Sequence, residues 1–387
     1  MYGGGRSDGV SGSTDVRGVG TGDDMGWLSS RLAARKSVAT TAAIAVLAGV
    51  PIGIAVLHQG FPVTDPDLHV RDVWVTNAEE LAAGRLNRQI EELDASVATT
   101  ASETDVFQHG EDVFLYDAAA GAIERVDAAF TTLVQRIDVP PASAVAYGGD
   151  VLAVLSPRGE LWTVPAAGEL AFDWRGTDPV AEVGTDGEVA VSDEGTVFAT
   201  NARDGVLLEL ERGAEEPAER EVGKLGAHEL AAVGERPVIL DLDENTLIVE
   251  DHRTELPDPA LRLQQSGPEH DDALVATATA LLEVPLGGGD VRELAHEGAE
   301  VTTDAEGVAA PVRVGSCAHG AWADAGRYLA VCDDAEPRGV DLEQSTAGAR
   351  LEFRVNRDVV VLNNLTNGDS WLVDSDLRLV DNWEEVT

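Results

Sequence analysis

Residues 113–127 read VFLYDAAAGAIERVD: two short runs of apolar residues separated by a segment that contains Asp and Gly. Apolar and polar residues alternate along these runs, which is typical of β-strands that bury one face. Asp and Gly favour a tight turn between the runs. The stretch therefore predicts a β-hairpin.

The same two-strand phrase recurs along the chain at intervals that average about forty-one residues. The first copy, VWVTNAEELAAGRLNRQI, begins at Val73, and the last, VVVLNNLTNGDSWLVD, begins at Val359. Most copies follow another short alternating stretch, so each unit should hold three or four strands. The second strand of each copy has one apolar anchor: Leu86, Ile123, Leu161, Leu208, Leu247, Val291, Val340 and Trp371.

Tandem units of this length with four strands each are typical of β-propeller blades. One blade cannot bury both of its faces alone, and a closed ring leaves no exposed end face. We therefore predict an all-β protein in which residues 71–387 form a β-propeller of seven or eight blades. Because the first copy lacks a leading strand, we expect the two ends of the chain to complete one blade together. A pair of β-sandwich domains is the alternative, since its strand spacing would be similar.

The amino-terminal part contains twenty consecutive uncharged residues, VATTAAIAVLAGVPIGIAVL, at Val38–Leu57. About twenty mainly apolar residues span a bilayer as a helix, and a basic flank stays in the cytoplasm. Arg31, Arg35 and Lys36 form such a flank. A cleaved secretory signal is the alternative, although the run is long for one and no small-residue cleavage site follows it.

These features divide the chain into four parts. We predict a disordered, Gly/Ser-rich cytoplasmic tail at residues 1–36, because it lacks apolar periodicity. A single transmembrane helix follows at 37–58 and a linker at 59–70. The propeller at 71–387 should then lie outside the cytoplasm.

The chain is strongly acidic, with 27 basic residues, 70 acidic residues and a formal net charge of −43. The tail is almost balanced, with five basic and four acidic residues, so the excess lies in the remainder. Such a surface repels phosphate backbones and anionic headgroups, so nucleic-acid binding is not expected. It would attract a basic partner or divalent cations. A charge that only keeps the surface hydrated, as in salt-adapted organisms, is the simpler interpretation.

Asp241, Asp243 and Asn245 have the D-x-D-x-N spacing with which calcium-binding loops begin. The remainder of such a loop is missing, because Thr246 replaces the glycine of the sharp turn and His252 replaces the closing glutamate. A hairpin turn explains the same residues, since Asp and Asn cap their own backbone. Calcium is therefore a weak candidate, and no other metal is predicted.

The two cysteines, Cys317 and Cys332, are fifteen positions apart. In an oxidising compartment they can form a disulfide, which stabilises a loop of this length by about 3 kcal/mol. Two unpaired buried thiols are the alternative. The spacing does not match a zinc site.

No metalloprotease, serine-hydrolase or nucleotide-binding motif occurs, and the eight histidines are scattered. We therefore predict no catalytic residue and no cofactor. Asp138, Asp150 and Glu160 are candidates to face a central channel, although no spacing selects them as an acid/base pair.

Two regions together resemble a known family. RKSVATTAAIAVLAGVPIGIAVLHQGFP, with the strands from Val73, and the closing VVVLNNLTNGDSWLVDSDLRLVDNW are similar to the amino-terminal region of actinobacterial surface proteins. Those proteins are membrane-anchored and carry tandem immunoglobulin-like or fibronectin type III modules. The resemblance covers residues 31–387 and implies an architecture, without implying catalytic residues.

The sequence thus predicts a single-pass membrane-anchored binding or scaffold module for a protein or cell-wall partner. Loops on a rigid scaffold commonly carry recognition. An envelope enzyme that acts on glycans through acidic channel residues is the alternative. A spacer or sensor that passes a signal through the helix is a third hypothesis.

Overall fold

The computed structural model describes residues 72–214, 216–295, 305–333, 335–342, 346–373 and 377–387. The predicted tail, membrane helix and linker lie outside these ranges. Within them, no helix is long and apolar enough to cross a bilayer.

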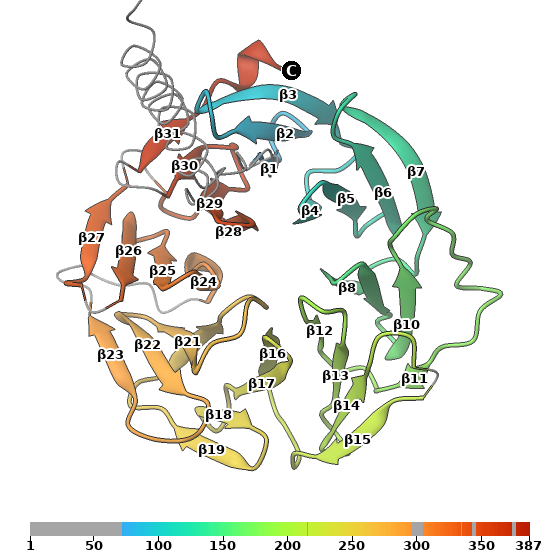
Figure 1. The fold of residues 1–387 in the computed structure, drawn as a ribbon, viewed down its shortest axis with the longest axis vertical. Coiled ribbons are helices and arrows are strands. Elements are labelled where there is room, and N and C mark those ends of the chain that lie inside the picture. The colour runs from blue at the N-terminus through green and yellow to red at the C-terminus, as the bar shows by residue number, and fades with distance from the viewer. Residues whose placement is uncertain (1–71, 215, 296–304, 334, 343–345, 374–376) are drawn as a thin grey trace, which may run out of the picture. The chain divides into compact units, whose positions relative to one another are not determined.

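The described residues form eight antiparallel β-sheets around a common centre (Figure 1). The first sheet has three strands and the other seven have four each. In four-stranded blades, the strand that comes first in the sequence lies near the centre and the last lies at the periphery (Figure 1). The predicted all-β propeller is confirmed, with eight blades.

Blades 1 to 4 use the first half of the described chain. Blade 1 comprises β1 (Val73–Asn77), β2 (Ala82–Asn87) and β3 (Glu92–Ala98). Blade 2 comprises β4 (Thr104–His109), β5 (Asp112–Asp117), β6 (Ala122–Asp127) and β7 (Thr132–Asp138). Blade 3 comprises β8 (Ala144–Gly148), β9 (Val151–Leu155), β10 (Glu160–Pro165) and β11 (Ala181–Glu182). Blade 4 comprises β12 (Val189–Val191), β13 (Val197–Asn201), β14 (Val206–Leu210) and β15 (Ala218–Glu221).

Blades 5 to 8 complete the ring. Blade 5 comprises β16 (His228–Val233), β17 (Arg236–Asp241), β18 (Thr246–Val249) and β19 (His252–Glu255). Blade 6 comprises β20 (Ala260–Leu263), β21 (Asp272–Thr277), β22 (Ala280–Pro285) and β23 (Arg292–Ala295). Blade 7 comprises β24 (Val312–Val314), β25 (Cys317–Trp322), β26 (Arg327–Cys332) and β27 (Arg338–Asp341). Blade 8 comprises β28 (Leu351–Asn356), β29 (Val359–Asn364), β30 (Ser370–Leu372) and β31 (Arg378–Val380). Two short 3₁₀ helices, η1 (Ala305–Gly307) and η2 (Trp383–Glu385), accompany the strands.

The hydrophobic core lies between neighbouring blades. Trp74 of blade 1 packs with Val113 and Leu115 of blade 2, and all three side chains are almost fully buried. Trp371 and Phe353 of blade 8 pack in the same way with Tyr328 of blade 7. Burial of one such large side chain contributes about 2–3 kcal/mol, so the contacts between blades stabilise the ring strongly.

A polar residue at the end of the second strand recurs as the cap of the following turn. The side chain of Asp117 accepts a hydrogen bond from the backbone N–H of Ala120 at 2.8 Å. Asn77, Asn201 and Asp241 accept an equivalent bond from the residue three positions later. This local turn chemistry explains why Asp and Asn occur at this point of the repeat phrase.

The predicted position of the repeat phrase is displaced by one strand in blades 6 and 7. The copies with the predicted anchors Val291 and Val340 cover the third and fourth strands of these blades, whereas the other copies cover the second and third. In blade 6 the true turn is capped by Thr277, which accepts a hydrogen bond from the N–H of Ala280 at 2.9 Å. Without the usual Asp or Asn, this hairpin lacks the marker on which the phrase depends.

The expected blade shared by the two chain ends is also wrong for the described residues. Blade 8 takes all four strands from residues 351–380, and blade 1 has no strand at its innermost position. Amide side chains occupy the free edge of β1 instead. Asn363 accepts from the N–H of Thr76 at 2.9 Å and donates to its carbonyl at 3.1 Å. Gln108 accepts from the N–H of Trp74 at 2.9 Å.

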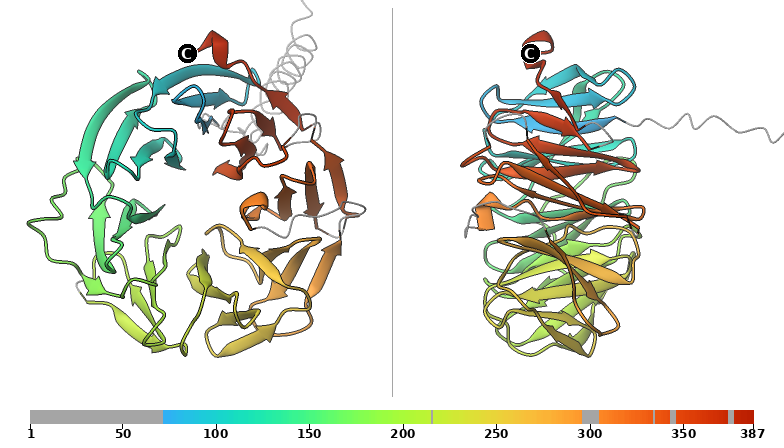
Figure 2. Two further views of the ribbon diagram at one scale, coloured as in Figure 1. Left: turned by 180° about the vertical axis from the view of Figure 1, so that it is seen from behind. Right: turned by 90° about the vertical axis from the view of Figure 1, so that its left-hand side faces the viewer.

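The carboxyl-terminal residues fasten blade 8 to the outer part of blade 1 (Figures 1 and 2). Asn382 bonds both backbone groups of Leu93, accepting from the N–H at 2.9 Å and donating to the carbonyl at 3.1 Å. The indole N–H of Trp383 donates to the carbonyl of Gly368 at 2.9 Å. The ring of Trp383 fills the space beside Gly84, where a Cβ would be 2.8 Å from the indole. A side chain at position 84 would therefore displace the tryptophan.

Cys317 and Cys332 lie directly opposite each other on β25 and β26 and form a disulfide, with Cα atoms 4.0 Å apart. This is the pairing that the sequence predicts. It fixes the register of the central hairpin of blade 7.

We expect Trp383→Ala to lower the free energy of unfolding by about 3 kcal/mol, because it leaves a cavity between blades 1 and 8. Phe130→Ala is the matched control, since the Phe130 side chain is 78% exposed and should contribute little. Urea unfolding followed by tryptophan fluorescence and circular dichroism measures both variants. Equal unfolding midpoints would contradict the fastening role of Trp383.

Candidate binding site at the central mouth

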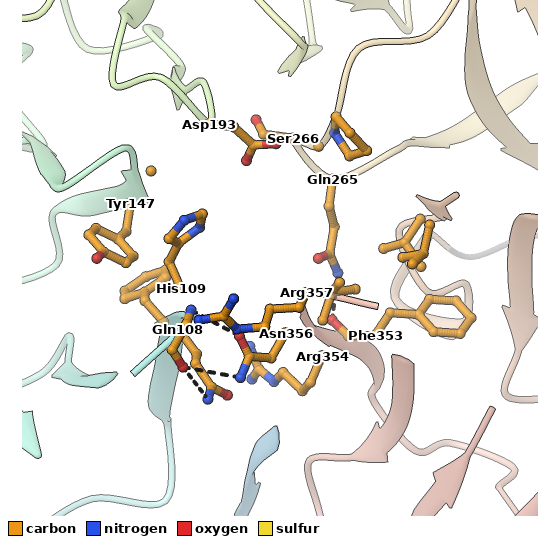
Figure 3. A pocket seen from close by; sticks show the side chains of 18 of the residues that line it. Gln108, His109, Tyr147, Asp193, Gln265, Ser266, Phe353, Arg354, Asn356 and Arg357 are labelled. Atoms are coloured by element: carbon orange, nitrogen blue, oxygen red, sulfur yellow. Dashed lines mark hydrogen bonds between the residues drawn. The ribbon is translucent and has the colours of Figure 1, made fainter. Parts of the chain in front are cut away.

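A cavity of about 880 Å³ opens at the centre of the ring (Figure 3). Seven of the eight blades contribute to its wall, the exception being blade 5. The contributing segments are mainly the ends of the innermost strands and the turns that follow them. The labelled side chains in Figure 3 are Gln108, His109, Tyr147, Asp193, Gln265, Ser266, Phe353, Arg354, Asn356 and Arg357.

The repeat itself brings these segments together. Each innermost strand is followed by an antiparallel second strand, so the first turn of each blade lies on the same face of the ring. His109 and Arg357 come from such turns, or from the strand ends beside them, in blades 2 and 8. Residues more than 240 positions apart in the sequence therefore share one cavity.

Arg354 joins blades 8 and 2 in the wall of the cavity. Its guanidinium contacts the carboxylate of Glu352 at 2.9 Å and that of Asp105 at 2.7 Å. It also donates to the carbonyl of Val106 at 3.2 Å. The Arg354 side chain is only 8% exposed, so these charges interact with little screening by solvent.

Glu352 has an altered protonation equilibrium. Desolvation by burial raises the pKa of the Glu352 carboxyl, and the negative charge of Asp105 acts in the same direction. Arg354 opposes both effects but does not cancel them. A cavity carboxyl with a raised pKa is protonated more readily than an exposed glutamate, which marks it as a candidate functional group.

Asn356 fixes the wall beside the edge strand of blade 1, β1. Its carbonyl oxygen accepts from the N–H of Gly110 at 2.9 Å, and its amide donates to the carbonyls of Gly110 at 3.1 Å and Asp72 at 2.8 Å. Gln108 also donates to the carbonyl of Asp72, at 3.0 Å. The donors and acceptors of both side-chain amides are already occupied by hydrogen bonds within the protein. This part of the wall therefore holds neighbouring residues in place and offers no free amide group to a ligand.

Charged side chains that face solvent surround the mouth. Glu111 and Arg357 are exposed, and His109 and Asp193 lie on the same rim (Figure 3). Desolvation raises the pKa of the Asp193 carboxyl, with Glu235 adding to this effect and His109 opposing it. The mouth thus offers both carboxylates and a free guanidinium to a ligand.

The residues that sequence reasoning placed near the channel lie elsewhere. Asp138 lines a separate depression on the outer side with Trp174, Asp150 pairs with Arg212 at 3.1 Å, and Glu160 pairs with Arg158 at 2.9 Å. Asp150 does lie in the first turn of blade 3, next to the cavity residues Tyr147 and Gly148, but it does not line the cavity. The expectation is therefore wrong for Asp138 and Glu160, because the innermost strand cannot be identified before the strands are assigned to their places in each blade.

The calcium candidates face different backbone groups. Asp241 caps its turn, Asp243 accepts from the N–H of Ala227 at 3.2 Å, and Asn245 accepts from the N–H of Ala260 at 2.9 Å. Only Asp241 caps its own turn, as the hairpin alternative expects, whereas Asp243 and Asn245 bond backbone groups of neighbouring segments. In the part of the chain that the structure describes, no group of three or more His, Cys, Asp or Glu side chains is placed to hold a metal ion.

Glu352, Arg354 and Arg357 were missed by sequence reasoning. One signal does precede them: the first turn of several blades reads Gly followed by an acidic residue, and in blade 8 it reads Arg-Asp. Alignment of the units on this first turn, in place of the second hairpin, would have identified Arg357 as an exception.

The chain matches no family model and no curated protein. Among solved structures, it is similar to the computationally designed Ika8 protein, with 15% identity over 79% of this chain and 98% of that one, at a TM-score of 0.57. AztD from Citrobacter koseri shares 9% identity over 80% and 93% of the two chains, also at a TM-score of 0.57. The dihydro-heme d1 dehydrogenase NirN shares 13% identity over 80% and 72%, at a TM-score of 0.56. These similarities establish the β-propeller fold alone, since one fold supports many functions.

A buried histidine behind the cavity wall should make the protein sensitive to acid. Burial, with help from Arg313, lowers the pKa of His319 from its ordinary value of 6.5 to about 4. The unfolded chain therefore takes up this proton at a higher pH than the folded protein does. The His319 contribution to stability should be fully present above pH 6.5 and should decrease by up to about 3 kcal/mol as the pH falls towards 4.

His319→Gln removes this titration and keeps a group that can bond the Tyr328 hydroxyl, which lies 2.8 Å from the imidazole. The difference in unfolding free energy between wild type and variant should therefore shrink between pH 7 and pH 4. His252→Gln, at an exposed position on β19, is the control. A difference that does not change with pH would contradict the assignment.

Proposed function

We propose that this protein is a binding or scaffold module that receives a protein or cell-wall partner at the central mouth. The observation that carries the proposal is the cavity of about 880 Å³, which is lined by seven blades and carries side chains of both charges. Wall groups such as Asn356 and Arg354 are held by contacts within the protein, while rim groups face solvent. Rigid walls with accessible rim groups suit recognition.

The proposal also places the propeller outside the cytoplasm, attached to the membrane by a single helix. The apolar run at Val38–Leu57 and its basic flank support a single-pass anchor with residues 59–387 outside the cytoplasm. The disulfide between Cys317 and Cys332 agrees with an oxidising compartment. The resemblance to actinobacterial surface proteins supports the same placement. The net charge of −43 disfavours nucleic acid as the partner.

A photo-crosslinking amino acid at Glu111, on the rim, should capture the partner in intact cells. A chemical crosslinker for amines is unsuitable, because the chain has only two lysines, Lys36 and Lys224. The control carries the same amino acid at Arg203, which is 78% exposed on a turn between second and third strands, away from the first turns that form the mouth. We expect a defined product from position 111 and none from position 203.

Two results would contradict the proposal. Identical crosslinked products from positions 111 and 203 would show that the partner does not bind specifically at the central mouth. Recovery of the intact chain in the cytosolic fraction of the same cells would contradict both the membrane anchor and the extracytoplasmic location.

A second candidate function is an envelope enzyme that acts on glycans through acidic residues of the channel. It is favoured by Glu352 and Asp105, whose carboxylates both contact Arg354, and by the raised pKa of Glu352. Such a carboxyl can act as a general acid.

If the protein is a binding module, the wild type should release no reducing ends from isolated cell-wall polysaccharide. If it is an enzyme, Glu352→Gln should lower the rate of release by about 100-fold or more, while Glu111→Gln on the rim should have little effect. A reducing-sugar assay measures both. Release that depends on Glu352 would favour the enzyme over the binding module.

A further inference from the structure

The turn between the innermost and second strands of blade 8 differs from the equivalent turns of other blades in the residue at its first position. Five blades connect their innermost and second strands by two residues. The first of these residues always has a positive φ: Gly110 at 63°, Gly149 at 50°, Gly234 at 58°, Gly315 at 58° and Arg357 at 58°. Four blades thus use glycine, and blade 8 uses arginine in the same left-handed conformation.

An arginine at this position is not explained by the turn. Glycine adopts positive φ without steric cost, whereas a Cβ clashes with the neighbouring carbonyl oxygen. The other four blades show that glycine satisfies the geometry. Residues held in such conformations are found preferentially at functional sites, where the side chain has a role of its own.

The Arg357 side chain reaches the central cavity (Figure 3). It is exposed, and its guanidinium passes close to the turn of blade 2, with Nη2 only 3.2 Å from the place where a Cβ of Gly110 would be. A glycine at position 110 therefore leaves room for it. Asn356, which precedes it, is fixed by three hydrogen bonds to backbone groups of Gly110 and Asp72.

Arg357 differs from the other arginines of the cavity wall in having no partner among the described residues. Arg313 pairs with Glu283 at 2.9 Å, and Arg354 pairs with Glu352 and Asp105. Arg357 forms no hydrogen bond or ion pair with the residues that the structure describes. A guanidinium has five donors arranged to bind a carboxylate or phosphate through two parallel hydrogen bonds.

We propose that Arg357 is the anchor for the carboxylate of a peptide ligand at the central mouth. The carboxylates of Glu111 and Asp193, which line the same cavity, repel a multiply charged phosphate but attract a ligand that also carries an amino group. A peptide with a free carboxylate and a lysine has both charges. The inference deepens the proposed function, on which it rests, by naming the class of ligand that the mouth accepts.

The test uses a pentapeptide that contains one lysine and ends in a free carboxylate, the same peptide with an amidated end, and inorganic phosphate. Isothermal titration calorimetry at low salt measures their affinity for the full chain in detergent. We expect the free acid to bind at least about tenfold more tightly than the amide or phosphate, because only it can use the bidentate pair and the acidic rim.

Arg357→Gly should weaken binding of the free acid at least about tenfold while keeping the melting temperature within about 2 °C of wild type. Relief of the left-handed conformation offsets the added freedom of glycine in the unfolded chain. Arg357→Lys keeps the charge without the fork and should bind with intermediate affinity. Arg203→Ala, which removes an exposed arginine on another turn, should bind as wild type does.

The proposal is overturned if Arg357→Gly binds the peptide as tightly as wild type, if the amide binds as tightly as the acid, or if wild type binds none of the probes at 10 mM or about that concentration. Tighter binding of phosphate would assign the site to phosphate ligands and overturn the peptide. The failures of the two proposals are distinguishable. If the Arg357→Gly variant still captures the partner in the photo-crosslinking experiment, the binding function is supported. Only the assignment of Arg357 as the carboxylate-binding residue is then contradicted.

Discussion

Closure of the ring depends on satisfying the free edge of β1. A buried backbone N–H or carbonyl without a hydrogen bond costs about 1–3 kcal/mol, so an innermost position without a strand is a serious constraint. The side-chain amides of Asn363 and Gln108 meet it by bonding the backbone of Thr76 and Trp74. The first and last blades are thereby joined at the centre by side chains, and at the periphery by Asn382 and Trp383.

The same closure shapes the candidate site. Because no described strand of blade 1 lies between them, the innermost strands of blades 2 and 8 approach closely enough for Arg354 to bond Asp105 and Val106. Asn356 is fixed against Gly110 for the same reason, and Arg357 follows it in the chain. The turn that follows β28 thus supplies the free guanidinium of the mouth, directly after the strand that joins blades 8 and 2.

Electrostatics separate the groups that hold the structure from those that can recognise a ligand. In an acidic chain, most cations close to carboxylates become paired, as Arg313 and Arg354 are in the cavity wall. A cation that remains free on the rim, together with unneutralised carboxylates, is what a ligand with charges of both signs requires. The remainder of the negative charge keeps the surface hydrated and repels polyanions.

The sequence by itself determined the all-β class, the tandem repeat and the propeller, because strand alternation and turn capping by residues such as Asp117 are local. The cysteine pair was predictable for the same reason, since Cys317 and Cys332 lie in one hairpin. Only the tertiary structure decided that the ring has eight blades, that blade 1 has no innermost strand among residues 72–387 where they are described, and that Glu352, Arg354 and Arg357 share a cavity with His109. These features depend on contacts between residues about 240 to 290 positions apart, which no local pattern records because each strand can be placed only after the ring has closed.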